Sequence, residues 1–284
     1  GLRDKFTGRA DILVNFFTMM AEGLREIMAE LGFKTIEEMV GQTQCLKQLE
    51  NVDHWKYKGV DLKPLLHKEE GSDEQTLHQS IEQKHLIHKI VDREMIKDAK
   101  AALDNQESVE LEYDVINTDR TIGAMISNEI SKKYNAEGLP ENTIKVKFNG
   151  SAGQSFGVWN AAGLNLKLNG DANDYVGKGM NGGKIVISSS AEYASQDSPA
   201  VLVGNTALYG ATGGELYVGG CVGERFAVRN SGASAVIEGA GDHCCEYMTG
   251  GHVTVLGNVG SNFGAGMTGG LAYEGMNNLG FHRT

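Results

Sequence analysis

Three glycines with the spacing G-x-G-x-x-G, Gly177, Gly179 and Gly182, match the spacing that holds a dinucleotide pyrophosphate in Rossmann folds. That chemistry requires a helix after the glycines, because the helix N-terminus binds the phosphates. Here the following residues, GKIVIS, have a strand pattern, and the same spacing recurs before another strand pattern in FGAGMTGGLAY. We therefore interpret these glycines as backbone turns of a repeat, with nucleotide binding as the alternative.

A second group of residues has the types that bind zinc. The candidates are Asp242, His243, Cys244, Cys245 and Glu246, with Cys221 and His252 farther away in the chain. A zinc site requires four such groups that converge tetrahedrally. The other interpretation, which we favour, is that the cysteines are small buried residues without a metal or redox role.

Two further clusters contain carboxylates. His78, Glu82, His85 and His88 would share one face of a charged helix expected from about Gln75 to Leu103, where they would either bind a metal or face solvent. The second cluster comprises Asp171, Asn173, Asp174 and Lys178. Its carboxylates would suit acid–base chemistry or Ca²⁺, but Asx residues beside glycines more often bond turn backbone, which is the role we expect. No catalytic, cofactor-binding or metal-binding residue is assigned.

Composition restricts the class of protein. The 284 residues carry a net charge of −11, which argues against nucleic acid and anionic membranes as partners. No apolar run approaches the roughly 20 residues needed to cross a bilayer, and the N-terminus has no signal-peptide pattern. Four cysteines without a C-x-x-C pair are typical of a reducing compartment, so we expect a cytoplasmic protein.

The chain changes character near residue 150, as 29 of the 38 glycines follow it. The first part is helical in pattern. Residues 11–31 carry an apolar stripe that must find a partner, Gly32 is a candidate C′ residue, and TIEE (35–38) is a capping box. The stripe consists of Ile12, Phe16, Phe17, Met20, Leu24, Ile27, Met28 and Leu31. A strand is expected at 108–116, and a helix after NTDRT with its end near Gly138.

The second part repeats a strand pattern and a glycine-rich turn about every twenty residues. The strand patterns start at residues 144, 164, 184, 200, 215, 234, 252 and 271. A repeat of this length predicts a solenoid, and a parallel β-helix suits it best, because glycine permits the tight corners. The expected fold class is therefore mainly β, with an N-terminal helical segment.

Several long stretches resemble the C-terminal GXGXG domain of the glutamate synthase large subunit family. They are GSAGQSFGVWNAAGLNLKLNGDANDYVGKGMNGGKIVI, NTDRTIGAMISNEI, GERFAVRNSGA and GDHCCEYMTGGHVTVLG, and LRDKFTGRADILVNFF is similar to the segment after the flavin domain. The resemblance implies that the β-helix is right-handed. Where the family usually has GDHGCEYM, this chain has Cys244 in place of glycine, which questions a positive φ there.

The resemblance also implies a division into three parts: a helical tail of the FMN-binding synthase domain at residues 1–40, a connector with the charged helix at 41–116, and a C-terminally truncated GXGXG domain at 117–284. The parent enzyme would make glutamate from glutamine and 2-oxoglutarate, with FMN and an iron–sulfur cluster as cofactors. The cluster cysteines would lie before residue 1, so we expect an excised fragment that binds no cofactor itself.

These observations favour a structural domain that positions the amidotransferase and synthase domains of its parent chain and is not catalytic alone. A small electron-donating subunit and a homo-oligomer are further expected partners. The first alternative is a stand-alone GXGXG subunit that assembles with separate synthase subunits. The second is a carbohydrate-active β-helix enzyme, which aromatic residues at 7% of the chain disfavour.

Overall fold

The computed structural model describes residues 8–49, 52–68, 76–85, 87–189 and 200–275. The chain separates into two compact units, Gly1–Lys84 and His85–Thr284. Among the described residues, no helix is sufficiently long and apolar to cross a membrane. The two units are treated separately below.

The first unit is dominated by one long helix. Helix α2 (Ala10–Leu31) ends at Gly32, which has a φ of 82° and provides the left-handed C-terminal cap. Helix α3 (Ile36–Met39) begins with the predicted capping box, in which the Glu38 amide donates to Thr35 Oγ1 at 3.2 Å. A 3₁₀ turn η1 (Thr43–Cys45) and helix α4 (Lys63–Leu66) follow. The sequence predictions for α2 and α3 are confirmed.

The apolar stripe of α2 lies open in this structure. Phe16, Phe17 and Met20 are each more than half exposed, and Met28 is the one buried residue of the helix. Exposed apolar surface of this extent on a single helix is typical of a surface that another chain or domain covers.

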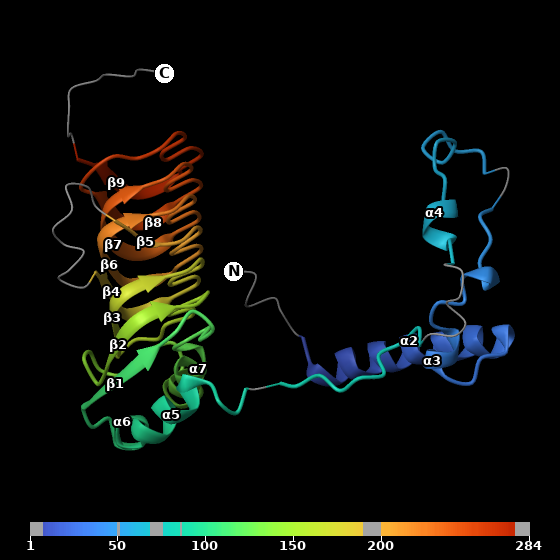
Figure 1. The fold of residues 1–284 in the computed structure, drawn as a ribbon, viewed down its shortest axis with the longest axis horizontal. Helices are drawn as coiled ribbons and strands as arrows, with labels where there is room; N and C mark the ends of the chain where they lie inside the picture. Colours follow the sequence, from blue (N-terminus) through green and yellow to red (C-terminus); the bar gives the residue numbers. More distant parts are fainter. Residues whose placement is uncertain (1–7, 50–51, 69–75, 86, 190–199, 276–284) are drawn as a thin grey trace. The chain divides into compact units, whose positions relative to one another are not determined.

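The second unit contains a sheet of nine parallel strands. They are β1 (Val109–Val115), β2 (Ile144–Ala152), β3 (Leu164–Ala172), β4 (Asn181–Ser188), β5 (Val201–Val203), β6 (Gly213–Val222), β7 (Ser231–Ala240), β8 (Thr249–Val255) and β9 (Gly269–Glu274). The order is that of the chain, except that β5 pairs with β3 and β6 beside the main path. Figure 1 shows the strands following one another from β1 to β9. The strand patterns expected from residue 144 onward are therefore confirmed.

Alternation along each strand builds the core. One row of paired residues runs through Val146, Leu166 and Ile185 to Leu216, and all four side chains are buried. The outward rows carry charges instead. Lys145 lies 2.9 Å from Glu110, its neighbour in the register. The burial of one face and the charge on the other fix the register of the strands.

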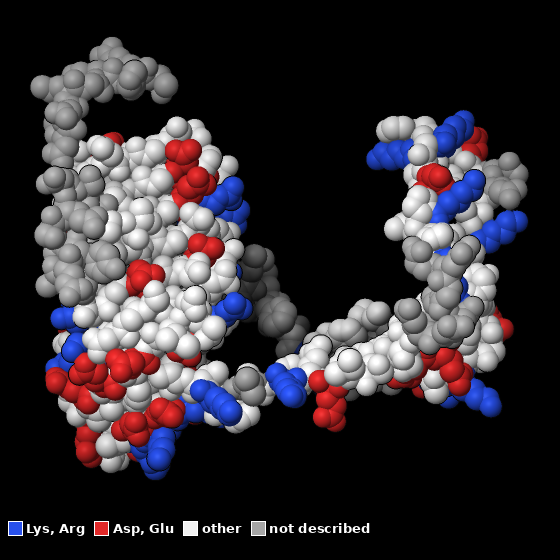
Figure 2. Space-filling model, viewed as in Figure 1, with Lys and Arg blue, Asp and Glu red and all other residues white. Residues whose placement is uncertain are grey.

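Three helices cover the β1 end of this unit. Helices α5 (Val91–Asp98) and α6 (Lys100–Asn105) precede β1, and α7 (Ala124–Tyr134) follows it. Helix α7 buries Ile126 and Ile130, and Ile122 just before it is also buried, as its sequence pattern predicts. Figure 2 shows acidic side chains gathered over this end, whereas the surface over the later strands is largely uncharged.

A buried carboxylate fixes the start of α7. Asp92 in α5 is 2% exposed and accepts hydrogen bonds from the amides of Gly123 at 2.8 Å and Met125 at 2.7 Å. Burial raises the pKa of Asp92, and these amide bonds oppose the rise. Because first-turn amides of a helix have no intrahelical acceptor, Asp92 acts as the cap of a helix that begins about thirty residues later in the chain.

Two expectations need correction. The prediction of a mainly β, right-handed parallel β-helix is wrong, because all nine described strands belong to a single parallel sheet and the described residues also form six α-helices. Helix α2 alone has 22 residues, more than the two longest strands, of 10 each, together. A repeat of strand and glycine-rich turn predicts parallel strands at regular spacing, but it does not predict how those strands are divided among sheets or how much helix the rest of the chain forms.

The charged helix expected from about Gln75 to Leu103 is also wrong over its first half. The described residues 76–85 and 87–90 are not helical, and helix begins only at Val91. None of the described side chains of 76–85 and 87–90 is buried, and helix propensity alone does not hold a segment that packs none of these side chains into a core.

Candidate functional site

The connections between strands are built as a stack of matching turns. Six five-residue segments have positive φ at their first, third and fifth residues. These segments, here called the stacked turns, are 155–159, 175–179, 206–210, 225–229, 243–247 and 262–266. An alternation of left- and right-handed residues turns successive amides to opposite sides, so each turn can bond to both of its neighbours.

The amides of the stacked turns form a regular ladder. The third amide donates backward, as from Gly177 to Phe156 O at 2.9 Å. The first and fifth donate forward, as from Tyr175 to Asn205 O at 2.9 Å and from Gly179 to Tyr209 O at 2.8 Å. The ladder satisfies the backbone groups that a buried turn would otherwise leave unbonded.

The ladder shows whether the amides of the glycine motif are free to bind a phosphate. The amides of Gly177 and Gly179 bond to neighbouring turns, and the Gly182 amide donates to Asn160 O at 3.1 Å. A phosphate site would need these amides free to point at the ligand. The residues after the motif form β4 and not a helix, as the sequence indicates. The glycines therefore serve the backbone.

The DHCCE cluster does not converge. Asp242 Oδ1 accepts from the Ser261 amide at 2.7 Å, and His243 Nδ1 lies 2.7 Å from Glu246 Oε1 at the surface. Cys244 and Cys245 are buried, with sulfur atoms 3.7 Å apart. The hydrogen bond with Cys245, together with burial, raises the pKa of the Cys244 thiol, which keeps it protonated and unreactive.

The family's glycine at position 244 is not required for its φ, because the positive values fall on His243 and Cys245 on either side. Over the described part of the chain, no three His, Cys, Asp or Glu side chains are grouped to hold a metal ion. Cys45 is exposed, and Cys221 is partly exposed and adjoins Gly239. Within the described part of the second unit, Cys221, Cys244 and Cys245 are thus not grouped as ligands of an iron–sulfur cluster.

The other predicted clusters are dispersed as well. Asp171 accepts from Ser151 Oγ at 2.6 Å, and Asp174 accepts from the Asn205 amide at 2.7 Å. Asn173 Oδ1 accepts from the Asp174 amide at 2.8 Å, and Lys178 Nζ lies 5.2 Å from the Tyr175 ring centre. The bonds of Asn173 and Asp174 are the backbone role expected for Asx residues in turns, whereas Asp171, in β3, bonds to a hydroxyl group.

The histidine and glutamate candidates are not on one helix face. His78, Glu82 and His85 lie in the non-helical stretch, and His88 is in a turn before α5. The boundary between the two units falls at Lys84 and His85. The helical spacing that would have brought them together is therefore missing.

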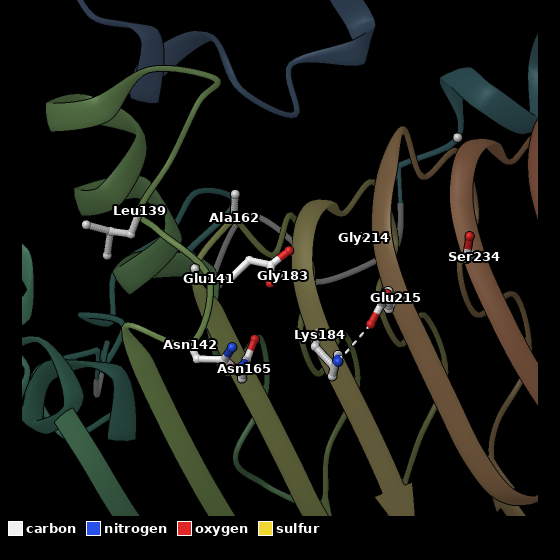
Figure 3. Close-up of a pocket in the computed structure, with 12 residues that line it drawn as sticks. Leu139, Glu141, Asn142, Ala162, Asn165, Gly183, Lys184, Gly214, Glu215 and Ser234 are labelled. Carbon is white, nitrogen blue, oxygen red and sulfur yellow. Dashed lines mark hydrogen bonds and ion pairs between the residues drawn. The ribbon is translucent and has the colours of Figure 1, made fainter. Parts of the chain in front are cut away.

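A polar groove lies along the starts of several strands (Figure 3). Its volume is about 440 Å³, and glycines such as Gly183 and Gly214 contribute its backbone surface. Lys184 Nζ lies 2.9 Å from Glu215 Oε2, and this bond raises the pKa of Lys184. Asn165 Nδ2 donates to Asn142 Oδ1 at 2.7 Å.

The groove has no set of residues that fits general acid–base or nucleophilic catalysis. Glu215, Ser234 and His252 follow one another across β6, β7 and β8. Within the described residues, however, no hydrogen bond joins Ser234 to His252, and Glu215 is engaged by Lys184. A nucleophile needs a base within hydrogen-bond reach, so this row does not form a catalytic triad. The arrangement suits polar contact with another molecule or domain.

Three large residues were not identified from the sequence; they stand at the fifth position of the stacked turns, where the other three turns have glycine. The fifth position is glycine at 179, 210 and 266, but it is Trp159, Arg229 and Tyr247 in the other turns. All three side chains are exposed. An alignment of the repeats to one another, turn by turn, would have revealed this substitution.

Comparison with known proteins gives a consistent result. A family profile described as the GXGXG motif matches residues 92–282. The NADPH glutamate synthase large chain of Bacillus subtilis is 50% identical over 274 residues, which are 96% of this chain and 18% of the relative. The NADH glutamate synthase of Schizosaccharomyces pombe is 48% identical over 96% of this chain and 13% of the relative.

A ferredoxin-dependent glutamate synthase of Synechocystis is also 48% identical, over 96% of this chain and 18% of its own length. The chain therefore spans less than a fifth of each of these relatives. Relatives whose names cite NADPH, NADH and ferredoxin match it almost equally well. Identity in this segment consequently does not indicate an electron donor.

Proposed function

Since this chain belongs to the GXGXG-motif family, and its curated relatives are glutamate synthases, we propose that it forms the C-terminal structural part of a glutamate synthase. Its role is to hold the amidotransferase and synthase domains at a fixed separation while ammonia passes from one to the other. The overall reaction would convert glutamine and 2-oxoglutarate to glutamate. A cytoplasmic location, expected from the cysteine usage, belongs to the same proposal.

The observation that carries this proposal is the match of 96% of the chain, at 43–50% identity, to segments of glutamate synthases from bacteria, a fungus, algae and plants. The structure supports a mechanical contribution. Every stacked turn is bonded to the turns beside it, and the core runs continuously from β1 to β8. Close packing and paired backbone groups make such a body stiff, which suits a spacer between domains.

The residues of this chain contribute shape and charge, and no bond-making step is assigned to them. FMN and the iron–sulfur cluster would supply the redox chemistry in other parts of the parent. The three cysteines in the described part of the second unit do not fit a cluster, as described above, so no step is routed through them.

A chimera tests the proposal. The matching segment of the Bacillus subtilis large chain is replaced by this chain, and a second variant lacks the segment. We expect the chimera to form glutamate from glutamine and 2-oxoglutarate. The deletion variant should hydrolyse glutamine but make little glutamate. A chimera that folds and hydrolyses glutamine without making glutamate would refute the positioning role.

Adding this chain in trans to the deletion variant distinguishes a separate subunit from a segment of one polypeptide. Restoration of glutamate formation in trans supports a separate subunit. Restoration only in the covalent chimera supports a segment of one polypeptide. The isolated chain, without either partner, should show no turnover.

A further inference from the structure

The outer surface of the stacked turns carries side chains that folding alone does not favour. Trp159, Arg229 and Tyr247 have φ values of 55°, 57° and 54°. A left-handed conformation is unfavourable for a residue with a Cβ, whereas glycine adopts it freely. Glycine fills the same position in three turns of the same geometry, so the fold accepts it there.

Burial offsets only part of this cost. Trp159 is 62% exposed and Tyr247 is 56% exposed, although each ring lies against the glycine of the following turn. Arg229 is exposed as well. Large side chains kept in an unfavourable conformation, with most of their surface in water, are better explained by a contact with another surface.

The same surface presents three cations without a carboxylate partner in a chain whose net charge is −11. Lys178, Arg225 and Arg229 are exposed and form no ion pair within the described residues. Most carboxylates of these turns are occupied, as Asp174 and Asp242 accept backbone amides and Glu246 pairs with His243. Glu224, beside Arg225, is the exposed exception.

The surface has the composition of a binding hot spot. Trp159 and Tyr247 stand four turns apart, which is about 19 Å at the spacing of neighbouring strands. Between them a Cβ at Gly210 would have no heavy atom within 4 Å, so the surface is open beside Arg229. Tryptophan, tyrosine and arginine are the residues enriched where interfaces lose most affinity on truncation.

We infer that this surface, the turn face (Trp159, Lys178, Arg225, Arg229 and Tyr247), binds an acidic surface on the remainder of the glutamate synthase polypeptide. The inference rests on the proposed function. Two observations select this occupant: the unpaired cations require negative charge opposite them, and in each relative more than four-fifths of the polypeptide lies outside the matching segment. The two aromatic rings contact apolar surface, and Arg229 pairs with a carboxylate.

Photo-crosslinking in the chimera tests the contact directly. Benzoylphenylalanine replaces Trp159, and a matched control replaces Lys167, an exposed residue that points outward from β3. We expect position 159 to crosslink to a peptide from outside the 284 residues that is rich in Asp and Glu, and position 167 not to. Crosslinks from 159 that stay within this chain, join a second copy or match those from 167 would overturn the inference.

Charge reversal at Arg229 is the second test of the turn face. Arg229→Glu in the chimera should reduce glutamate formation about tenfold or more while leaving glutamine hydrolysis in place, and Arg229→Lys should retain most of it. Lys167→Glu is the control of equal charge change. Thermal unfolding of the same variants in the isolated chain checks that each one folds.

The outcomes separate the two proposals. A wild-type chimera that makes no glutamate contradicts the proposed function, and this inference falls with it. An active chimera in which Arg229→Glu behaves like Lys167→Glu contradicts the turn face alone.

Discussion

The indole ring of Trp159 lies over Gly179, so that a Cβ at position 179 would be 2.8 Å from Trp159 Cδ1. No ordinary Cβ contact is that short. Gly179 also has a φ of 63°. The second glycine of the G-x-G-x-x-G motif is therefore favoured by the φ of the turn and required by the ring that covers it.

Gly179→Val and Gly210→Val form a matched pair. Both glycines have a φ of 63°, but a Cβ at Gly210 meets no atom within 4 Å. We expect Gly210→Val to lower the free energy of unfolding by about 1–3 kcal/mol through backbone strain, and Gly179→Val by about 1–3 kcal/mol more through the clash with Trp159. Urea unfolding measures both. Trp159→Ala should recover part of the difference, and equal losses in the pair would show that the ring is irrelevant.

Asp92→Ala should destabilise the second unit by about 2–4 kcal/mol, because it leaves buried amides at the start of α7 without an acceptor. Asp92→Asn keeps one acceptor oxygen and should lose less. Burial raises the folded-state pKa of Asp92, so its contribution to stability is full below about pH 4 and declines as the pH rises through the folded value. The measured cost of Asp92→Asn should therefore shrink with rising pH, and a cost that grows instead would contradict this assignment.

The contribution of Asp104 to stability has the opposite pH dependence to that of Asp92. Hydrogen bonds from Lys100 and Lys133 lower its pKa to about 2. Its contribution to stability is therefore present above about pH 4 and disappears as the pH falls through about 2. Acid unfolding of Asp104→Asn beside wild type should show a difference that closes over this range. Because the pair is exposed, high salt should reduce the difference, and a salt-independent gap would argue against an ion-pair origin.

The cysteines should react in two classes. Cys45 is exposed, whereas Cys244 and Cys245 are buried and the pKa of Cys244 is raised. We expect an aromatic disulfide reagent to modify Cys45 rapidly, Cys221 slowly because burial raises the pKa of its thiol, and the buried pair only on unfolding. Cys45→Ser should remove the fast phase. A rapid reaction of two further thiols in the folded Cys45→Ser chain would show that the pair is accessible.

The parts of the fold that depend on local pattern were predictable. The apolar spacing of α2, its Gly32 cap and the Thr35 capping box are signals contained within a few residues. The strands of the second unit follow from alternation and from regularly placed glycines. These features need no information on distant parts of the chain, so the sequence indicates them correctly.

The parts that depend on distant contacts were not. Asp92 caps a helix through bonds to residues more than thirty positions later, and nothing near Asp92 in the sequence marks it as a cap. The left-handed conformations of Trp159 and Tyr247 run against the preference of large residues, and only the bonds of neighbouring turns impose them. Candidate sites chosen by residue type alone dispersed in part for the same reason, since Asp174 and Asp242 accept amides of neighbouring turns.

Each of the four inner stacked turns sends one amide to the turn before it and two to the turn after it. The hydrogen-bonding groups that an inner turn offers on its two sides are therefore the same from one inner turn to the next. A complete strand-and-turn unit duplicated in the gene would meet compatible neighbours on both sides, and the loss of a complete unit would rejoin compatible ones. Such a body can change in length by whole steps of one strand spacing, about 4.8 Å, and the distance between whatever it joins is adjustable by evolution or by design.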